Sequence, residues 1–193
     1  MSSTQPDFGD LIARLARALA DQDLPFMLIG GQAVLLHGEP RLTQDVDVTL
    51  GVPPTRLVDA LAACEATGLT LLPEDVTAFV RDTFVLPTAD PQTGIRVDLI
   101  FSTTPYEAQA IERSVFIEVN AVRVPFASAE DLILHKLFAG RPRDIEDAAG
   151  VVRRKGRELD WVYIRAWAVK FSVVPGREHL LEQVRALERE RHP

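Results

Sequence analysis

The chain of 193 residues has one cysteine, Cys64, and no long hydrophobic run. A single cysteine excludes an intramolecular disulfide framework, and the alanine-rich helical pattern around it predicts a small buried side chain. No apolar run approaches the ~20 residues of a membrane helix, and residues 1–7 lack the basic and apolar regions of a signal peptide. We therefore expect a cytoplasmic protein without a membrane segment.

The composition is that of an ordinary globular protein, with 47% hydrophobic and 25% charged residues. The length suits one domain, or one domain with a helical extension. A net charge of −7 disfavours non-specific binding to nucleic acid. However, residues 136–157 contain 7 Lys and Arg and only 3 acids. That stretch is either the solvated end of a helix or a surface that binds the phosphate groups of a nucleic acid.

Secondary-structure signals divide the chain into an α/β part and a helical part, with a boundary near residue 127. Strands are predicted at residues 26–29, 46–50, 78–86, 95–101, 115–119 and 122–126. Helices are predicted at residues 7–22, 32–37, 53–67, 128–139, 143–155, 159–171 and 177–191, and a further helix is predicted to begin at Thr104. We therefore predict an α/β core over residues 1–127 and a helical C-terminal subdomain over residues 128–193 that packs on it.

Two acids, Asp45 and Asp47, lead into the apolar run that ends at Leu50. Side chains two residues apart in a strand point to the same face, and their Cα atoms lie about 6.6 Å apart. Two carboxylates so placed can hold one hard cation, or two ions close together. The alternative is an exposed edge strand with two solvated acids.

A third acid, Asp98, is flanked by apolar residues in the predicted strand at 95–101. An acid in such a place is rarely buried unless it is paired or bound to metal. A carboxylate from a neighbouring strand would complete a site for Mg²⁺, or for Mn²⁺, with water and phosphate as further ligands. The alternative is an ion pair with Arg96 on the same face of the strand.

The glycine pair Gly30-Gly31 follows the first predicted strand and precedes a helix. Glycine lets backbone N–H groups approach a ligand closely, and a helix start offers unpaired donors to phosphate. Gln32 can add a side-chain donor. The alternative is a plain strand-to-helix turn. Together with the three acids, the glycines indicate a site for a nucleoside triphosphate with metal.

These residues resemble the nucleotidyltransferase superfamily of the DNA polymerase β type. The fuller pattern is similar to the AbiEii/AbiGii-type toxin nucleotidyltransferases, which include the Men-type toxins. The matching residues are Gly30, Gly31, Arg41, Thr43, Asp45, Asp47, Asp98, Lys136 and Asp144. The resemblance spans roughly residues 26–150. It implies a polymerase-β-like α/β (α+β) core, with a mixed sheet flanked by helices, followed by a helical C-terminal part.

The resemblance also implies roles for the acids. Asp45 and Asp47 would bind the catalytic metals. Asp98 would bind the metal on the side of the second substrate and help to deprotonate the attacking hydroxyl. Thr43 would shape the turn before the strand.

For the triphosphate, the resemblance assigns Gly30, Gly31 and Gln32 to the β- and γ-phosphates, although many relatives have serine where Gln32 stands. Lys136 would contact the triphosphate, and Arg41 would contact it or offset the charge of the three acids. Asp144 would orient Lys136 or contact the nucleotide. The alternatives are a cation at a helix C-terminus for Lys136 and a helix cap for Asp144.

The reaction implied is attack of a hydroxyl on the α-phosphate of a nucleoside triphosphate, with release of pyrophosphate. By resemblance the acceptor is RNA, at the 3′ end of tRNA, in a toxin that has an antitoxin protein as partner. The alternatives are transfer to a partner protein, transfer to a small molecule, and a non-catalytic nucleotide-binding module. The retention of all three acids argues against the last alternative.

Overall fold

The computed structural model describes residues 8–190. The prediction that the chain lacks a signal peptide concerns residues 1–7, which lie outside the described residues. The described residues form two compact units. The first unit comprises residues 8–32 and Thr43–Phe126, and the second comprises Ala33–Leu42 and residues 127–190. The predicted division at residue 127 therefore differs from these units in one respect, because residues 33–42 belong with the C-terminal helices.

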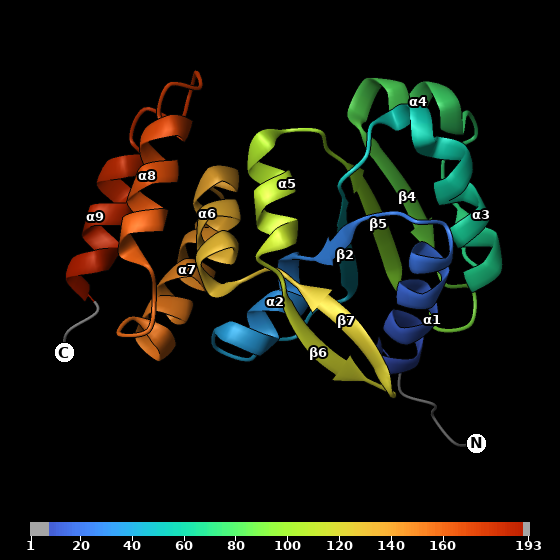
Figure 1. The fold of residues 1–193 in the computed structure, drawn as a ribbon, viewed down its shortest axis with the longest axis horizontal. Coiled ribbons are helices and arrows are strands. Elements are labelled where there is room, and N and C mark those ends of the chain that lie inside the picture. Colours follow the sequence, from blue (N-terminus) through green and yellow to red (C-terminus); the bar gives the residue numbers. More distant parts are fainter. Residues whose placement is uncertain (1–7, 191–193) are drawn as a thin grey trace. The chain divides into compact units, whose positions relative to one another are not determined.

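The first unit is a mixed α/β structure, as predicted (Figure 1). Its helices are α1 (Phe8–Asp21), the start of α2 (Gly30–His37), the short 3-10 helix η1 (Pro54–Arg56), α3 (Leu57–Thr67), α4 (Val76–Thr83) and α5 (Pro105–Glu112). Its strands are β1 (Phe26–Leu28), β2 (Asp45–Leu50), β3 (Thr70–Leu71), β4 (Val85–Ala89), β5 (Arg96–Phe101), β6 (Val115–Val119) and β7 (Val122–Phe126).

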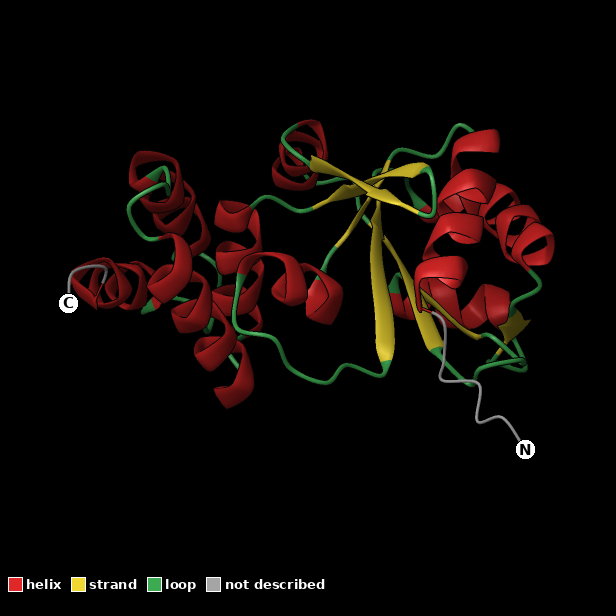
Figure 2. Cartoon of the chain, turned by 90° about the horizontal axis from the view of Figure 1, so that it is seen from below, coloured by secondary structure: helices red, strands yellow, loops and turns green. Residues whose placement is uncertain are grey.

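The strands form a seven-stranded mixed sheet in the order β3-β4-β5-β2-β1-β7-β6. The central pair, β2 and β5, is parallel, whereas β1 runs antiparallel to β2. Helices α1 and α3 pack against each other and lie beside the sheet (Figures 1 and 2). Val46, Val48 and Val97 are fully buried and alternate along their strands with the polar residues of the site described below.

The predicted strand at residues 78–86 was wrong for most of its length. Residues up to Thr83 form helix α4, and only the end of the run enters strand β4. The side chain of Asp75 caps this helix by accepting a hydrogen bond from the Ala78 amide at 2.9 Å. Phe84 ends it with a left-handed backbone at φ 60°. Val80 is the one buried residue of α4, so the apolar run did not mark a buried strand.

The second unit is helical and contains the rest of α2. Its other helices are α6 (Ala129–Ala139), α7 (Pro142–Lys155), α8 (Trp161–Phe171) and α9 (Leu180–Glu190). Ser128 caps α6 by accepting a hydrogen bond from the Asp131 amide at 3.1 Å, and Pro142 occupies the first turn of α7. No helix within residues 8–190 has the length and apolar character needed to cross a membrane. Cys64 is buried as predicted, and burial raises the pKa of its thiol to about 12.

Candidate active site

The three predicted acids of the sheet lie on one face of the central strand pair. In the parallel register of β2 and β5, Asp45 lies opposite Arg96 and Asp47 lies opposite Asp98. Laterally paired residues point to the same side of a sheet, as do residues two apart in a strand. Asp45, Asp47 and Asp98, which together form the carboxylate patch, therefore share one face with Arg96. Asp45 is exposed, whereas Asp47 and Asp98 are partly buried.

The glycine pair leaves room for this patch. Gly30 has a left-handed backbone at φ 62°, and a Cβ atom placed on it would lie 1.9 Å from Asp47 Oδ2. A Cβ atom on Gly31 would lie 2.2 Å from Thr43 Oγ1. Any larger residue would displace these side chains. The glycines thus bring the start of helix α2, with its N–H donors, next to the Asp47 carboxylate and the Thr43 hydroxyl.

Thr43 and Gln32 both donate hydrogen bonds to Asp45, the first residue of β2. The Thr43 hydroxyl donates a hydrogen bond to Asp45 Oδ1 at 2.7 Å. The buried Gln32 amide group donates to the backbone carbonyl of Asp45 at 3.4 Å. Sequence reasoning gave Thr43 only a turn-shaping role, although its Thr-x-Asp spacing could have indicated this contact. Thr43 orients a carboxylate of the patch.

The expected alternative for Asp98, an ion pair with Arg96, is present. Arg96 Nε lies 2.9 Å from Asp98 Oδ1 and 3.1 Å from Asp98 Oδ2. The hydrogen bond and the charge of Asp98, followed by the charges of Asp45 and Asp47, raise the pKa of Arg96. Arg96 is therefore a cation that all three acids of the patch attract.

The patch suits a divalent cation in its chemistry. Its donors are carboxylate oxygens, which Mg²⁺ and Mn²⁺ prefer, and the missing Cβ of Gly30 provides the space that the Asp47 carboxylate occupies. Within residues 8–190, no three His, Cys, Asp or Glu side chains are gathered closely enough to hold a metal ion. The residues fit the ion, but the patch with Arg96 in place is not arranged as a closed metal cage.

The other predicted site residues meet in the second unit, in a buried ion network. Lys136 Nζ lies 2.9 Å from Asp144 Oδ1 and 2.8 Å from Asp147 Oδ2, and the three side chains are 8%, 3% and 6% exposed. Arg41 donates two hydrogen bonds to the Asp147 carboxylate, at 2.8 and 2.9 Å. Arg141 pairs with Asp144 at 2.5 Å. These two carboxylates thus hold the cations together.

Asp147 is the residue of this network for which sequence reasoning predicted no role. The spacing of Asp144 and Asp147, three residues apart in α7, places both carboxylates on one helix face. That spacing was the available signal. The structure brings Lys136, Asp144 and Arg41 together through Asp147, with the Lys136 ammonium buried.

Both acids of the network ionise more readily than usual. Burial opposes the ionisation of Asp144, but hydrogen bonds from Arg141 and Lys136 outweigh it and lower the pKa of this carboxyl. The same balance, with Arg41 in place of Arg141, lowers the pKa of Asp147. The resulting stabilisation is present above the unfolded-state pKa of about 3.9. It is lost as the pH falls from there through the folded-state pKa.

We therefore expect the free energy of unfolding to fall as the pH is lowered below about 4. Part of that fall should be missing in Asp144→Asn, because this variant has one carboxyl fewer to protonate. Urea unfolding curves recorded across this pH range measure the difference. An identical pH dependence in the variant and the wild type would contradict the assigned role of Asp144.

Gly30→Ala tests the fit between the glycine and Asp47. The left-handed backbone alone should cost about 1–2 kcal/mol, and the displaced carboxylate should add to this. Gly68→Ala is the matched control, because Gly68 has φ 78° with no atom within 4 Å of its Cβ position. Chemical denaturation of both variants should show a larger loss for Gly30→Ala. Equal losses would mean that Asp47 accommodates the added methyl group freely.

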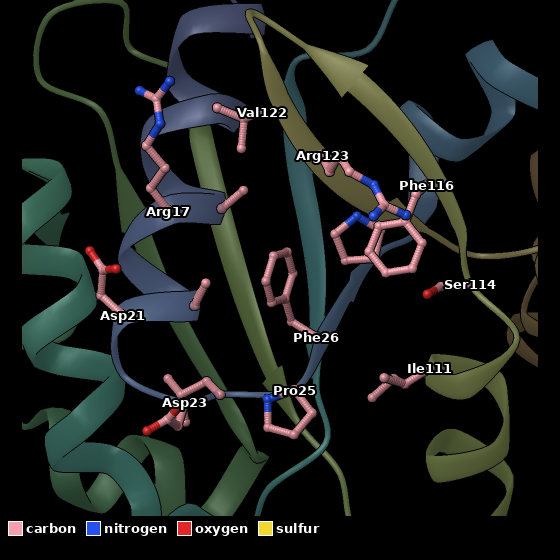
Figure 3. A pocket seen from close by; sticks show the side chains of 14 residues that line it. Arg17, Asp21, Asp23, Pro25, Phe26, Ile111, Ser114, Phe116, Val122 and Arg123 are labelled. Carbon is pink, nitrogen blue, oxygen red and sulfur yellow. The ribbon is translucent and has the colours of Figure 1, made fainter.

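A separate cavity of about 650 Å³ opens in the first unit beside α1 and the β6–β7 hairpin (Figure 3). Phe26 and Pro25 form part of its wall, and the Arg123 guanidinium lies 4.6 Å from the centre of the Phe116 ring. Its lining contains no residue of the carboxylate patch and neither glycine of the pair. The cavity is therefore distinct from the carboxylate patch.

Comparisons with known proteins give the family and the fold. Residues 8–173 match a family described as "Nucleotidyltransferase of unknown function (DUF6036)". No curated protein sequence matches the chain.

Solved structures share the fold. The antibiotic-resistance factor ANT(2'')-Ia is 17% identical, with a TM-score of 0.57 over 89% of this chain and 96% of its own. An antigenic nucleotidyltransferase-like protein from Paracoccidioides brasiliensis is 17% identical, with a TM-score of 0.53 over 93% and 94%. The lincosamide antibiotic adenylyltransferase LnuA, solved with lincomycin bound, is 16% identical, with a TM-score of 0.51 over 77% and 98%.

Proposed function

Because the chain belongs to this family of nucleotidyltransferases, we propose that it transfers a nucleoside monophosphate from a nucleoside triphosphate to a hydroxyl group. The observation that carries the proposal is the carboxylate patch. Three acids from two adjacent parallel strands share one face, and Gly30 makes room for one of them. Hydroxyl acceptors and triphosphates are poor reaction partners until charge is neutralised and geometry is fixed, and a divalent cation held by such a patch would do both.

In the proposed step, the hydroxyl oxygen of the acceptor attacks the α-phosphorus, and the bond between the α-phosphorus and the bridging oxygen to the β-phosphate breaks. Pyrophosphate leaves, and the hydroxyl proton passes to the Asp98 carboxylate. Asp45, Asp47 and Asp98 would hold Mg²⁺, or Mn²⁺, which when bound supplies positive charge at the triphosphate. Thr43 would keep the Asp45 carboxylate turned toward this position.

For the triphosphate, we propose contacts from the backbone of Gly30 and Gly31 and from Gln32, at the start of helix α2. Arg41 is two residues from Thr43 in the chain, and the family resemblance supports a nucleotide contact for it. We propose that Lys136 contacts the triphosphate and that Asp144 orients Lys136. Both belong to the ion network that also holds Arg41.

The acceptor that we propose is RNA, at the 3′ end of tRNA. The resemblance to the AbiEii/AbiGii-type toxins supports it, and so does the basic stretch at residues 136–157, which has 7 Lys and Arg and only 3 acids. The exposed arginines in α7 and directly beside its two ends are Arg141, Arg143, Arg153, Arg154 and Arg157. Guanidinium groups contact phosphates well. The second candidate acceptor is a small-molecule hydroxyl, which the fold shared with the lincosamide adenylyltransferase supports.

Incubation with Mg²⁺ and each of the four α-labelled nucleoside triphosphates tests the proposal. Separate reactions contain total RNA, purified tRNA, total protein, an aminoglycoside or a lincosamide. Label in tRNA that is lost on removal of the 3′ end supports the first acceptor, whereas label in the antibiotic supports the second. Label in protein would show that the acceptor is a protein and would contradict both proposed acceptors. Absence of transfer in every reaction would overturn the proposed activity.

A role as a toxin with an antitoxin partner follows from the same resemblance. Induced expression of the wild-type chain in bacteria should arrest growth, and expression of Asp47→Asn should not. Equal growth with both, at equal protein levels, would contradict the toxin role while leaving the transfer activity to be judged by the labelling reactions.

A further inference from the structure

Four charged side chains form a compact arrangement on one face of the central strands. Arg96 lies across from Asp45 in the register and two residues from Asp98 in the strand, while Asp47 lies across from Asp98. Arg96 thus neighbours two of the acids directly and faces the third diagonally. Among these four residues the formal charge is −2, because one guanidinium faces three carboxylates.

We infer that Arg96 is the resident counter-cation of the carboxylate patch, and that it competes with the divalent metal for Asp98. In the metal-free protein Arg96 holds Asp98, and metal binding requires that it release this carboxylate. The inference rests on the proposed function, since it takes the metal to be part of the reaction. It adds a residue, Arg96, that no motif of the family resemblance contains.

The hydrogen bonds between the two residues show why release is needed. A single donor, Arg96 Nε, lies within hydrogen-bonding distance of both oxygens of the Asp98 carboxylate. A divalent ion that used either oxygen would come within a few ångströms of the guanidinium, and two cations at that distance repel. For the ion to bind Asp98, Arg96 must therefore move.

The exposure of the pair shows that Arg96 is able to move. Its side chain is 54% exposed, against 21% for Asp98. A turn of the side chain would carry the guanidinium into water, so no charge would be buried on the way, and long exposed side chains change rotamer rapidly. In contrast, the short side chains of the acids start from backbone positions that the strand register fixes, and Asp45 is also held by Thr43. The acids stay in place, and the cation is the exchangeable partner.

Titration with Mn²⁺, followed by the loss of the free-ion electron paramagnetic resonance signal, tests the inference without any reaction taking place. Arg96→Gln should bind Mn²⁺ roughly tenfold more tightly than the wild type, the effect expected when one unit charge is removed about 6 Å from a divalent ion. Arg96→Lys keeps the charge and should stay close to the wild type.

Arg81→Gln is the matched control. Arg81 forms an ion pair with Asp82 on the surface of the same unit, outside the patch. Its replacement changes the net charge of the chain by the same amount as Arg96→Gln, so it should leave the Mn²⁺ affinity within about twofold of the wild type if the effect is local.

Thermal unfolding supplies a second measurement. Without metal, Arg96→Gln should melt below the wild type, because the acids of the patch then repel one another without a counter-cation. Added Mn²⁺ should raise its melting temperature by more than that of the wild type, since a ligand that binds only the folded state stabilises in proportion to its affinity.

Equal or weaker Mn²⁺ binding in Arg96→Gln, or an equal gain in Arg81→Gln, would overturn the inference. Its failure is separable from that of the proposed function, because transfer is measured with labelled nucleotide and affinity with Mn²⁺ alone. Intact transfer with unchanged affinity would reject only the role of Arg96. Tighter binding in Arg96→Gln without any transfer would support the counter-cation and reject the proposed reaction.

Discussion

Replacement of Asp47 by asparagine is expected to reduce the rate of nucleotidyl transfer by roughly a thousandfold, with the fold retained. Asp47 is the carboxylate for which Gly30 makes room, and it lies across from Asp98 in the parallel register. Asparagine keeps the size of the side chain but removes the negative charge that a divalent ion requires. The measurement is the initial rate of transfer from an α-labelled nucleoside triphosphate at saturating Mg²⁺.

Asp82→Asn is the control for this loss. Asp82 is an exposed acid of the same unit, pairs with Arg81, and takes no part in the carboxylate patch. It should transfer at the wild-type rate. Circular dichroism and the melting temperature of both variants check that they are folded. A rate for Asp47→Asn within about tenfold of the wild type would contradict the place of Asp47 in the proposed reaction.

Replacement of Lys136 by methionine should lower the free energy of unfolding by roughly 3 kcal/mol. The Lys136 ammonium is the cation that Asp144 and Asp147 share, and both acids are buried. Without it, two like charges are left close together in a poorly solvated place. The estimate lies at the low end for a broken buried pair, because Arg41 still holds Asp147 and Arg141 still holds Asp144. Urea unfolding at neutral pH measures the change.

Arg153→Met is the control, because Arg153 pairs with Glu39 on the surface of the same unit. Exposed pairs contribute little, so this variant should unfold at nearly the wild-type urea concentration. Loss of stability in Lys136→Met no larger than in Arg153→Met would contradict the picture of a buried network. The double variant Lys136→Met/Asp144→Asn should regain part of the loss, since it removes one of the two like charges that Lys136 no longer bridges.

Local rules predicted much of the first unit. The glycine pair marked the end of β1 and the start of α2, and residues 96–101 were recognised as a strand by their apolar character. The run at residues 78–86 was misassigned, because a short apolar run does not by itself distinguish a surface helix from a strand. The helix α4 that forms there is capped by a single hydrogen bond, from the Ala78 amide to the Asp75 side chain.

In the candidate site, too, some features follow from local rules and others do not. That Asp45 and Asp47 share a face follows from the two-residue period of a strand, so the sequence alone determined it. Which acid lies next to them does not follow, since the neighbour of β2 could have been any of the other strands. The parallel pairing with β5, which sets Asp98 beside Asp47, is a long-range choice of the whole sheet.

The sequence by itself determined the residue types of the candidate site, their order along the chain, and the faces of their own strands and helices. Only the tertiary structure decided the long-range neighbours: Asp98 beside Asp47 in the parallel register, and Asp147 as the partner of both Arg41 and Lys136. The physical reason is that periodicity and capping act over a few residues. The choice among several carboxylates for each cation depends on burial and distance, which exist only once the chain has folded.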